Sequence, residues 1–303
     1  MQEVLSVKNL CKSFNQVIAL DDFELRVKEG ELFGIVGPDG AGKTTAIKIF
    51  CGVEKKDAGD INILGYNIDF NRELINREIG YLSQKFSLYG DLTIDENIEF
   101  FAKIHGVKNY KERREELLHF TRLTPFRKRL ADKLSGGMRQ KLALASTLIH
   151  SPKIIFLDEP TNGVDPVSRR DFWGILSVLL KQGITIIIST PYLDETERCT
   201  KVALVNKGKV LIQDTPAKIK DVIKENVYEI VCSPVREIYK HLKKRFDQME
   251  IQMFGDRLNV LTSIPFNKVI DEITSQGYKV IDSRKVLPSL ENVFIHMMTE
   301  AYE

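Results

Sequence analysis

The sequence predicts an α/β fold over residues 1–220 and a small α+β domain with ferredoxin-like topology over residues 221–303. Two observations predict the first part: short apolar runs of the length of buried parallel strands, and a glycine-rich turn that links one such run to a helical segment. The order strand, helix, strand, strand, helix, strand after residue 220 predicts the second part. The apolar runs are Leu32–Val36, Ile154–Leu157 and Ile184–Ile188.

Size and composition are those of a globular protein. The 303 residues allow two domains, and an apolar fraction of 43% and a charged fraction of 28% are ordinary. A net charge of +2 gives no reason to expect a nucleic-acid partner, and no apolar run approaches the roughly 20 residues that cross a bilayer. The first residues lack the basic and apolar regions of a signal peptide, and the four cysteines are widely spaced. We therefore expect a cytosolic protein that binds no nucleic acid.

Residues 1–30 are expected to form the β-structure that opens the first domain. Val4–Val7 and Phe23–Val27 alternate partly between apolar and polar side chains, and a turn-prone segment around Asn15 lies between them. Phe14 comes directly before this turn. Its ring could stack on an adenine base, and the alternative is a residue of the hairpin core.

A phosphate-binding loop is predicted between the apolar run Leu32–Val36 and a helical run that ends at Phe50. The segment matches the pattern G-x-x-x-x-G-K-[ST] in the strand–turn–helix context that the pattern requires. Glycines let backbone N–H groups approach a phosphate, the helix start adds partial positive charge, Lys43 adds a full charge, and the hydroxyl of Thr44 can bind Mg²⁺. The plain alternative is a glycine turn beside a lysine. The residues predicted to line the nucleotide phosphates are Gly37, Pro38, Asp39, Gly40, Ala41, Gly42, Lys43, Thr44 and Thr45.

A helical region follows a buried strand, Ile79–Gln84, that ends on a polar amide. Thr93 and Glu96 have the spacing of a capping box, and apolar residues recur at helical spacing from Ile94 to Ile104. A second helix is expected over Tyr110–Leu123. These helices and the one after Ser135 place a helical subdomain at about residues 86–150.

A second anion site is possible at Leu134–Gln140, where Ser135 is a natural N-cap residue for the next helix. Gly136 and Gly137 in a first helical turn each lower helix propensity by about 1 kcal/mol, which a chain tolerates where a ligand approaches the backbone closely. The serine hydroxyl, bare amides and helix dipole would together attract an anion. The alternative is an ordinary capped helix start.

Two adjacent carboxylates, Asp158 and Glu159, end the apolar run Ile154–Leu157. This pattern describes a central parallel strand with acids at its carboxyl end, where open α/β sheets bind ligands. Asp158 could hold Mg²⁺, and Glu159 could orient or deprotonate a water that attacks a terminal phosphate. Asp165 lies in the turn that follows, directly before a proline. The alternative is a chance pair of acids at a strand end.

The second domain carries no recognisable chemistry. Its expected strands and helices contain no clustered histidines, cysteines or paired acids. The charged stretches Lys111–Glu116 and Lys240–Arg245 are interpreted as solvated helix faces. The expected elements are strands at Val227–Cys232, Ile251–Phe254, Leu258–Leu261 and Tyr278–Ile281, and helices at Val235–Phe246, Phe266–Thr274 and Leu290–Met298.

In their order and spacing, these motifs resemble those of the ATP-binding subunits of ABC transporters. The resemblance covers residues 1 to about 220 and rests on Gly37–Thr44, Gln84, Leu134–Gln140, Ile154–Pro160 and Asp165. The segment Leu287–Phe294 is similar to the accessory C-terminal domain of ABC-2-type exporter ATPases. The resemblance implies a P-loop ABC-ATPase fold with a mixed central sheet, an antiparallel β subdomain and a helical subdomain.

The resemblance also implies cofactors, partners and residue roles. ATP and Mg²⁺ would bind between two subunits in a head-to-tail dimer, and the subunits would sit on the inner face of the cell membrane through an integral membrane permease. The catalytic residues would be Glu159, as base, and Gln84; the metal ligands would be Thr44, Gln84 and Asp158. Phe14 would stack on adenine, and the partner's nucleotide would meet Ser135, Gly136, Gly137 and Asp165.

One position departs from the family pattern. Members of the family usually carry a histidine that touches the γ-phosphate after the strand Thr185–Thr190, and here Pro191 occupies that position. Proline has neither an imidazole nor an N–H donor. We therefore expect ATP to bind well and to be hydrolysed slowly at this chain's own P-loop, which favours a heterodimer over a homodimer.

The function expected from the sequence is a cytosolic ATPase subunit that powers a separate permease, with export as the direction. The segment Gln84–Asp91 and the helices as far as Leu123 would dock the permease. The alternatives are a soluble non-transport ABC ATPase that acts on ribosomes or DNA, and a binding-only regulatory partner. The transported molecule is not encoded in this chain.

Overall fold

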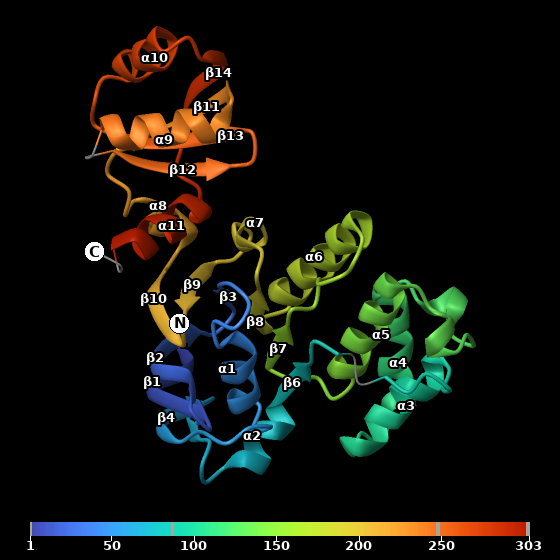
Figure 1. The fold of residues 1–303 in the computed structure, drawn as a ribbon. Helices are drawn as coiled ribbons and strands as arrows, with labels where there is room; N and C mark the ends of the chain where they lie inside the picture. Colours follow the sequence, from blue (N-terminus) through green and yellow to red (C-terminus); the bar gives the residue numbers. More distant parts are fainter. Residues whose placement is uncertain (1, 86–87, 247–248, 301–303) are drawn as a thin grey trace. The chain divides into compact units, whose positions relative to one another are not determined.

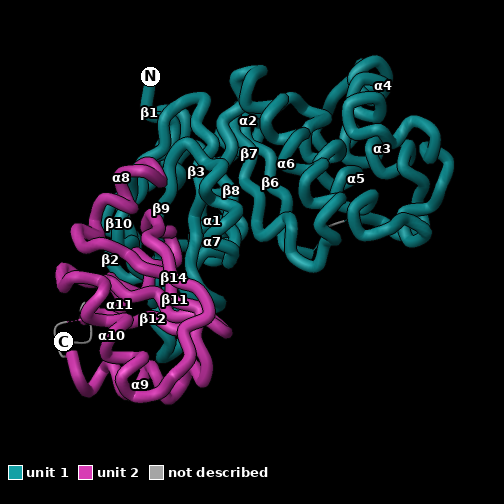
Figure 2. Tube along the Cα trace, turned by 90° about the horizontal axis from the view of Figure 1, so that it is seen from above, with its two compact units in different colours: residues 1–214 teal, residues 215–303 magenta. Residues whose placement is uncertain are grey.

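The computed structural model describes residues 2–85, 88–246 and 249–300, and it divides into two compact units, Met1–Asp214 and Thr215–Glu303 (Figure 2). Residue 220, where the sequence places the domain boundary, is the last residue of helix α8 (Pro216–Lys220), which belongs to the second unit. None of the helices in the described ranges has the length and apolar character of a transmembrane segment.

The first unit contains two sheets (Figure 1). One is antiparallel, in the order β2-β1-β4-β5, and the other is a mixed six-stranded sheet in the order β10-β9-β3-β8-β7-β6, in which only the pairing of β10 with β9 is antiparallel. The mixed central sheet and the antiparallel subdomain are therefore confirmed. The strands are β1 (Glu3–Phe14), β2 (Val17–Lys28), β3 (Leu32–Val36), β4 (Ala58–Ile63), β5 (Tyr66–Asn67), β6 (Ile79–Leu82), β7 (Ile154–Asp158), β8 (Thr185–Thr190), β9 (Lys201–Asn206) and β10 (Lys209–Asp214).

The three central strands β3, β7 and β8 are buried at every residue. Continuous apolar runs with β-branched residues suit this position, because both faces of a parallel sheet are covered. Helix α1 (Lys43–Phe50) packs on β7, where the rings of Phe50 and Phe156 lie 6.0 Å apart. Helices α2 (Arg72–Glu78), α6 (Pro166–Lys181) and α7 (Leu193–Thr196) also contact strands of the central sheet.

Three helices form the helical subdomain: α3 (Ile94–Ile104), α4 (Tyr110–Phe120) and α5 (Gly136–Leu148). The capping box of Thr93 and Glu96 is present at the start of α3, as predicted. Helix α4 ends three residues before the predicted Leu123. There Arg122 adopts a left-handed φ of 59°, and Leu123 N donates to the carbonyl of Leu118 at 2.8 Å, which closes the helix.

The second unit has the predicted β-α-β-β-α-β order, and its antiparallel sheet has the strand order β12-β13-β11-β14. This is the ferredoxin-like topology. Helices α9 and α10 pack on the sheet around a core that includes Ile230, Leu242 and Ile273. The elements are α8 (Pro216–Lys220), β11 (Asn226–Ser233), α9 (Val235–Arg245), β12 (Glu250–Phe254), β13 (Arg257–Thr262), α10 (Phe266–Ser275), β14 (Lys279–Val286) and α11 (Leu290–Glu300).

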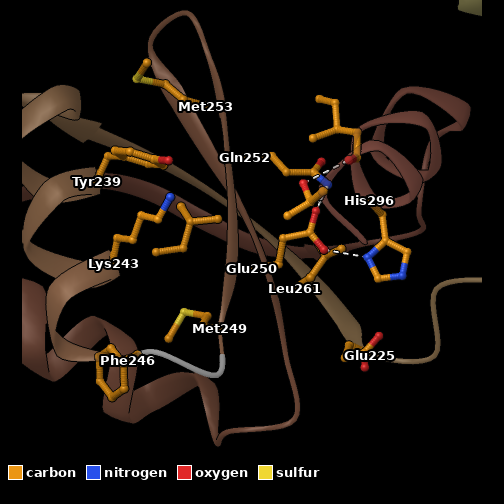
Figure 3. A pocket seen from close by; sticks show the side chains of 13 residues that line it. Glu225, Tyr239, Lys243, Phe246, Met249, Glu250, Gln252, Met253, Leu261 and His296 are labelled. Atoms are coloured by element: carbon orange, nitrogen blue, oxygen red, sulfur yellow. Dashed lines mark hydrogen bonds and ion pairs between the residues drawn. The ribbon is translucent and has the colours of Figure 1, made fainter. Parts of the chain in front are cut away.

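A cavity of about 740 Å³ in this unit runs along β12 between α9 and α11 (Figure 3). Figure 3 shows Tyr239 and Lys243 on one side of β12 and His296 on the other. Two polar pairs hold α11 to the strand: His296 Nδ1 lies 2.5 Å from Glu250 Oε2, and the amides of Gln252 and Asn292 bond at 2.7 Å. These contacts explain how the last helix is fixed within its own unit.

Candidate functional site

The phosphate-binding loop has the backbone that its glycines were expected to permit. Gly40 and Gly42 have φ values of 79° and 101°, in the left-handed region. Gly37 is needed for a close approach instead, because a Cβ there would overlap the carbonyl oxygen of Val205 in β9. Packing against β9 is therefore by itself a sufficient reason for glycine at position 37.

Helix α1 begins directly after this loop without a side-chain cap. Its N-cap residue is Gly42, which supplies no side-chain cap to the first turn, and this turn contains the half-buried Thr44 and Thr45. Pro38 and Asp39 are exposed on the loop, and Ala41 is buried. A helix start without a side-chain cap suits an anionic ligand.

Lys43 bridges the loop and the carboxyl end of β7. Its Nζ donates to the carbonyls of Gly37 at 2.9 Å and Pro38 at 3.0 Å, and it lies 3.3 Å from Glu159 Oε1. The lysine is only 4% exposed. The ammonium therefore stands between the loop and the predicted catalytic acid, in a position to contact a terminal phosphate.

Asp158 has one satisfied and one unsatisfied carboxylate oxygen. Oδ1 accepts hydrogen bonds from Thr44 Oγ1 at 3.0 Å and Ser189 Oγ at 2.7 Å, whereas Oδ2 is buried without a partner. Burial raises the pKa of this carboxyl, and the two hydroxyl groups oppose the shift. A cation beside Oδ2 would satisfy the orphaned oxygen, so the site fits the Mg²⁺ predicted at Thr44, Gln84 and Asp158.

The described residues contain no group of three or more His, Cys, Asp or Glu side chains arranged for a metal ion. Magnesium in nucleotide sites is usually held by one or two protein oxygens together with phosphates and water. The single orphaned carboxylate oxygen of Asp158 beside the Thr44 hydroxyl fits this mode of binding.

Glu159 is held in a strained backbone conformation. Its φ of 47° is unusual for a residue with a side chain, and its N–H donates to Ser189 Oγ at 3.0 Å. Gln84 Nε2 donates to Glu159 Oε2 at 2.8 Å. The structure thus brings together both residues predicted to be catalytic. Of the predicted permease-docking segment, residues 86–87 lie outside the described residues.

The signature residues Ser135, Gly136 and Gly137 lie at the start of α5, on the other side of β6 and β7 from α1 (Figures 1 and 2). Ser135 is the predicted N-cap, and its Oγ accepts from Met138 N at 3.3 Å. Within the described ranges, no hydrogen bond or ion pair joins Ser135 to the phosphate-binding loop. One chain therefore does not combine these two predicted halves of the site.

The two signature glycines differ in their surroundings. A Cβ on Gly136 would meet open space, whereas a Cβ on Gly137 would lie 2.6 Å from Ser168 Cβ in α6. The expected reason for both glycines was close approach of a ligand. At Gly137 the packing of α5 against α6 is by itself a sufficient reason.

Asp165 is the exposed N-cap of α6, with Oδ1 accepting from Val167 N at 3.1 Å and Ser168 N at 3.0 Å. These hydrogen bonds lower the pKa of its carboxyl, so it is ionised at neutral pH. Phe14, at the end of β1, is 44% exposed, with Lys12 Nζ 4.8 Å from its ring centre. The hairpin-core alternative for Phe14 is therefore wrong.

Pro191 follows β8 directly and is half-buried. Around it, Tyr192 N donates to Thr190 Oγ1 at 3.1 Å, and Thr190 Oγ1 donates to Glu195 Oε2 at 2.9 Å. Sequence reasoning missed Ser189, which contacts Glu159, and Glu195, which contacts Thr161 and Thr190. A hydroxyl at the end of an apolar strand was the signal for Ser189; Glu195 had no signal in the sequence.

Comparisons with known proteins place these motifs in one family. The family model described as "ABC transporter" matches residues 20–162. YbhF of Escherichia coli K12, a probable multidrug ABC transporter ATP-binding protein, is 38% identical over 221 residues, which are 72% of this chain and 38% of YbhF. The chain thus spans well under half the length of that relative.

Two other relatives are matched over nearly their full length. The daunorubicin resistance ATP-binding protein DrrA2 of Streptomyces coeruleorubidus is 31% identical, over 94% of this chain and 92% of its own. The Nod factor export ATP-binding protein I of Rhizobium sp. N33 is 32% identical, over 94% of both chains.

Solved structures agree with the fold of the first unit. The structure of an ATP-binding subunit of an ABC transporter is similar with a TM-score of 0.66 and 28% identity, over 72% of this chain and 92% of that one. The dimeric bacterial ABC transporter cassette MJ0796 has a TM-score of 0.64 and 27% identity, over 70% and 98%. The chain therefore belongs to the family of ABC transporter ATP-binding proteins.

Proposed function

We propose that this chain is the ATP-hydrolysing subunit of an ABC exporter and that it drives a separate integral membrane permease. The observation that carries the proposal is the set of contacts around Glu159: Gln84 bonds one carboxylate oxygen and Lys43 pairs with the other. A base, its orienting amide and a phosphate-binding cation are thereby assembled at the end of the strand that also carries Asp158.

In the proposed reaction, Glu159 accepts a proton from water as the water oxygen bonds to the terminal phosphorus and the bond to the bridging oxygen breaks. Gln84 and Lys43 keep the Glu159 carboxylate in place, and backbone N–H groups of residues 37–45 hold the phosphates. Thr44, Gln84 and Asp158 would hold Mg²⁺, which neutralises charge on the phosphates when it is bound.

The other half of the site is proposed to come from a second ABC subunit. Ser135 and Gly136 are exposed, and so is Asp165, although all three carry features suited to an anion or a dimer contact. The related cassette MJ0796 is a dimer. We infer a head-to-tail pair in which Ser135, Gly136 and Gly137 of each subunit meet the γ-phosphate bound by the other, with Phe14 stacked on the adenine.

Pro191 is proposed to slow hydrolysis at this chain's own phosphate-binding loop and to favour a heterodimer. Loss of one preorganised donor to a developing charge typically costs a factor of about 10²–10³ in rate. Pro191→His should raise the turnover of the purified chain, and Pro191→Ala, which restores the N–H but not the imidazole, should not. Equal turnover of all three proteins, at the level of other ABC ATPases, would contradict this role.

Export as the direction is supported by the names of the relatives, a daunorubicin resistance protein and a Nod factor export protein. We place the chain on the cytoplasmic face of the membrane, with the permease docked near Gln84, α3 and α4. No nucleic acid is expected as a partner. Affinity purification from its native host should co-purify a membrane protein with several spans; recovery of ribosomes or DNA instead would favour a non-transport ABC ATPase.

A binding-only regulatory partner is the second candidate, and Pro191 favours it. The contacts of Glu159 with Gln84 and Lys43 favour hydrolysis instead. Single-turnover hydrolysis of ATP by the purified chain separates the two, because a regulatory partner binds ATP without producing ADP.

A further inference from the structure

Glu195 is a buried carboxylate that contacts the loop containing Glu159 and the end of the neighbouring strand β8. It lies in α7 and is 3% exposed. Its Oε2 accepts hydrogen bonds from Thr161 Oγ1 and Thr190 Oγ1, both at 2.9 Å, and its Oε1 lies 3.4 Å from Arg169 Nε. A buried charge persists only with such partners, so the cluster is a fixed part of the fold.

One of these contacts reaches the strained turn of Glu159. A residue with a side chain in the left-handed region is strained and persists only where several surrounding contacts fix its conformation. The contacts that hold this turn include those of Ser189 Oγ, which accepts from Glu159 N, Gln140 Nε2, which donates to Pro160 O, and Glu195 Oε2, which accepts from Thr161 Oγ1. Within the turn, Asn162 N donates to the carbonyl of Glu159 at 3.2 Å.

The other contact reaches the segment that contains Pro191. Thr190 ends β8, and its hydroxyl both donates to Glu195 and accepts from Tyr192 N. The guanidinium of Arg169 lies 4.7 Å from the ring centre of Tyr192. One carboxylate oxygen therefore joins the loop after β7 to the loop after β8, and both loops flank the predicted site of hydrolysis.

We propose that Glu195 is a positioning residue for ATP hydrolysis. Its carboxylate holds Thr161 and Thr190, and through Thr161 it keeps Glu159 beside Gln84 and Lys43. This inference rests on the proposed function, because it concerns the rate of the reaction assigned to Glu159. Within the described residues, Glu195 makes no hydrogen bond or ion pair with the phosphate-binding loop, with Gln84 or with Glu159.

Four variants and one control test the role. Glu195→Ala should lower kcat by about 10–100-fold, because a displacement of about 1 Å at a catalytic group can cost a factor of 10². The dissociation constant of ATP should stay within about twofold of the wild-type value, since the phosphate-binding loop is unchanged. Asp194→Asn, on the exposed side of the same helix, should leave both quantities unchanged.

The conservative variant and the double variant distinguish positioning from general damage. Glu195→Gln keeps an oxygen acceptor for the two threonines and should recover most of the lost kcat. Thr161→Val should reproduce much of the loss. The double variant Glu195→Ala, Thr161→Val should be no slower than Glu195→Ala alone, because the effects of substitutions within one contact network are not additive.

Two kinetic results would overturn the inference: a kcat for Glu195→Ala within twofold of wild type, or equal losses of kcat and ATP affinity. A crystal structure of Glu195→Ala provides a readout that needs no hydrolysis. Glu159 should leave its left-handed φ or lose its contact with Gln84, and an unchanged Glu159 would refute the positioning role. If the wild-type chain binds ATP without ever hydrolysing it, the proposed function fails, while the crystal structure still decides the role of Glu195.

Discussion

The two predicted halves of the nucleotide site are built in different ways. In the phosphate-loop half, side chains bond across distant segments: Thr44 to Asp158, Lys43 to Glu159, and Gln84 to Glu159. In the signature half, Ser135 and Asp165 bond to residues in the first turn of the helix that each one caps. The side chains of the first half are therefore held in place by the fold of one chain, whereas those of the second half lie exposed at the starts of α5 and α6.

This difference predicts where the effect of a substitution appears. Changes in the phosphate-loop half disturb contacts that already exist within one chain, so they should alter binding or hydrolysis per subunit. Changes in the signature half should leave the single chain intact unless they disturb packing, and they should act only in the assembled dimer.

The largest effect is expected for Glu159→Gln. The amide keeps the shape of the side chain but cannot accept a proton, so hydrolysis should fall by about 10²–10⁴-fold while ATP binding remains. Steady-state ADP production and an ATP-dependent dimer in size-exclusion chromatography measure the two quantities. Glu112→Gln, on α4, is a matched control. Retained hydrolysis would show that the phosphate-loop half does not work through this base.

The next largest effect is expected on stability and concerns His150, which links the end of α5 to strand β6. His150 follows α5, stacks on His105 at 3.9 Å and lies 2.9 Å from the carbonyl of Ile79 through Nε2. Burial, and secondarily the neighbouring His105, lower the pKa of His150 to about 4, and Glu78 nearby opposes this shift. The folded chain therefore holds this imidazole neutral.

Stability should consequently fall as the pH drops from 6.5 towards 4. In this window the unfolded chain takes up a proton at His150 and the folded chain does not, so the loss would be on the order of 3 kcal/mol, complete near pH 4 and absent above 6.5. Urea denaturation across this range should show a flatter profile for His150→Gln. His119→Gln, at an exposed histidine of α4, should keep the wild-type slope.

A smaller effect separates the two signature glycines. Gly137→Ala should destabilise the chain by about 1–3 kcal/mol, because its new methyl group meets Ser168, and adding Ser168→Gly should restore stability. Gly136→Ala should keep or slightly raise stability, because the position is open and helical. A loss of hydrolysis in Gly136→Ala without loss of stability would locate the effect in the dimer; unchanged hydrolysis would count against a trans contact there.

The smallest effect is expected at Phe14. If its ring stacks on adenine, Phe14→Ala should weaken ATP binding by about 1 kcal/mol, or roughly fivefold. Isothermal titration calorimetry with ATP measures this change. Phe70→Ala, at another exposed aromatic residue (84% exposed), should leave the affinity unchanged. Equal affinities for wild type and Phe14→Ala would remove Phe14 from the site.

The elements that could be predicted from the sequence are those with local causes. Continuous apolar runs marked β3, β7 and β8, and the strand–glycine–helix pattern placed Lys43 and Thr44 correctly at the start of α1. The capping box of Thr93 was predictable because its two partners are three residues apart. The roles of these residues in ATP binding remain predictions.

The contacts that could not be predicted join residues far apart in the sequence. Thr161 and Glu195 are separated by 34 positions, and Asp158 and Ser189 by 31. No local periodicity encodes such a pairing, because it depends on which strands become neighbours in the sheet. The same holds for Gly137: only the position of Ser168 shows why a residue with a side chain would not fit there.

The glycines of the phosphate-binding loop have a consequence for how loss-of-function variants are read. Gly37 presses against the backbone of Val205 in β9, and a Cβ at Gly42 would lie 2.6 Å from the carbonyl oxygen of Ala19 in β2. The loop is thus wedged between one strand of each sheet in the first unit. A larger residue at either position would clash with the backbone of a strand and disturb the packing of the two sheets. Loss of activity in such a variant would therefore reflect damage to the fold rather than a lost phosphate contact. A Cβ at Gly40 would meet open space, so a substitution there adds the strain of its φ of 79° but no clash with either sheet.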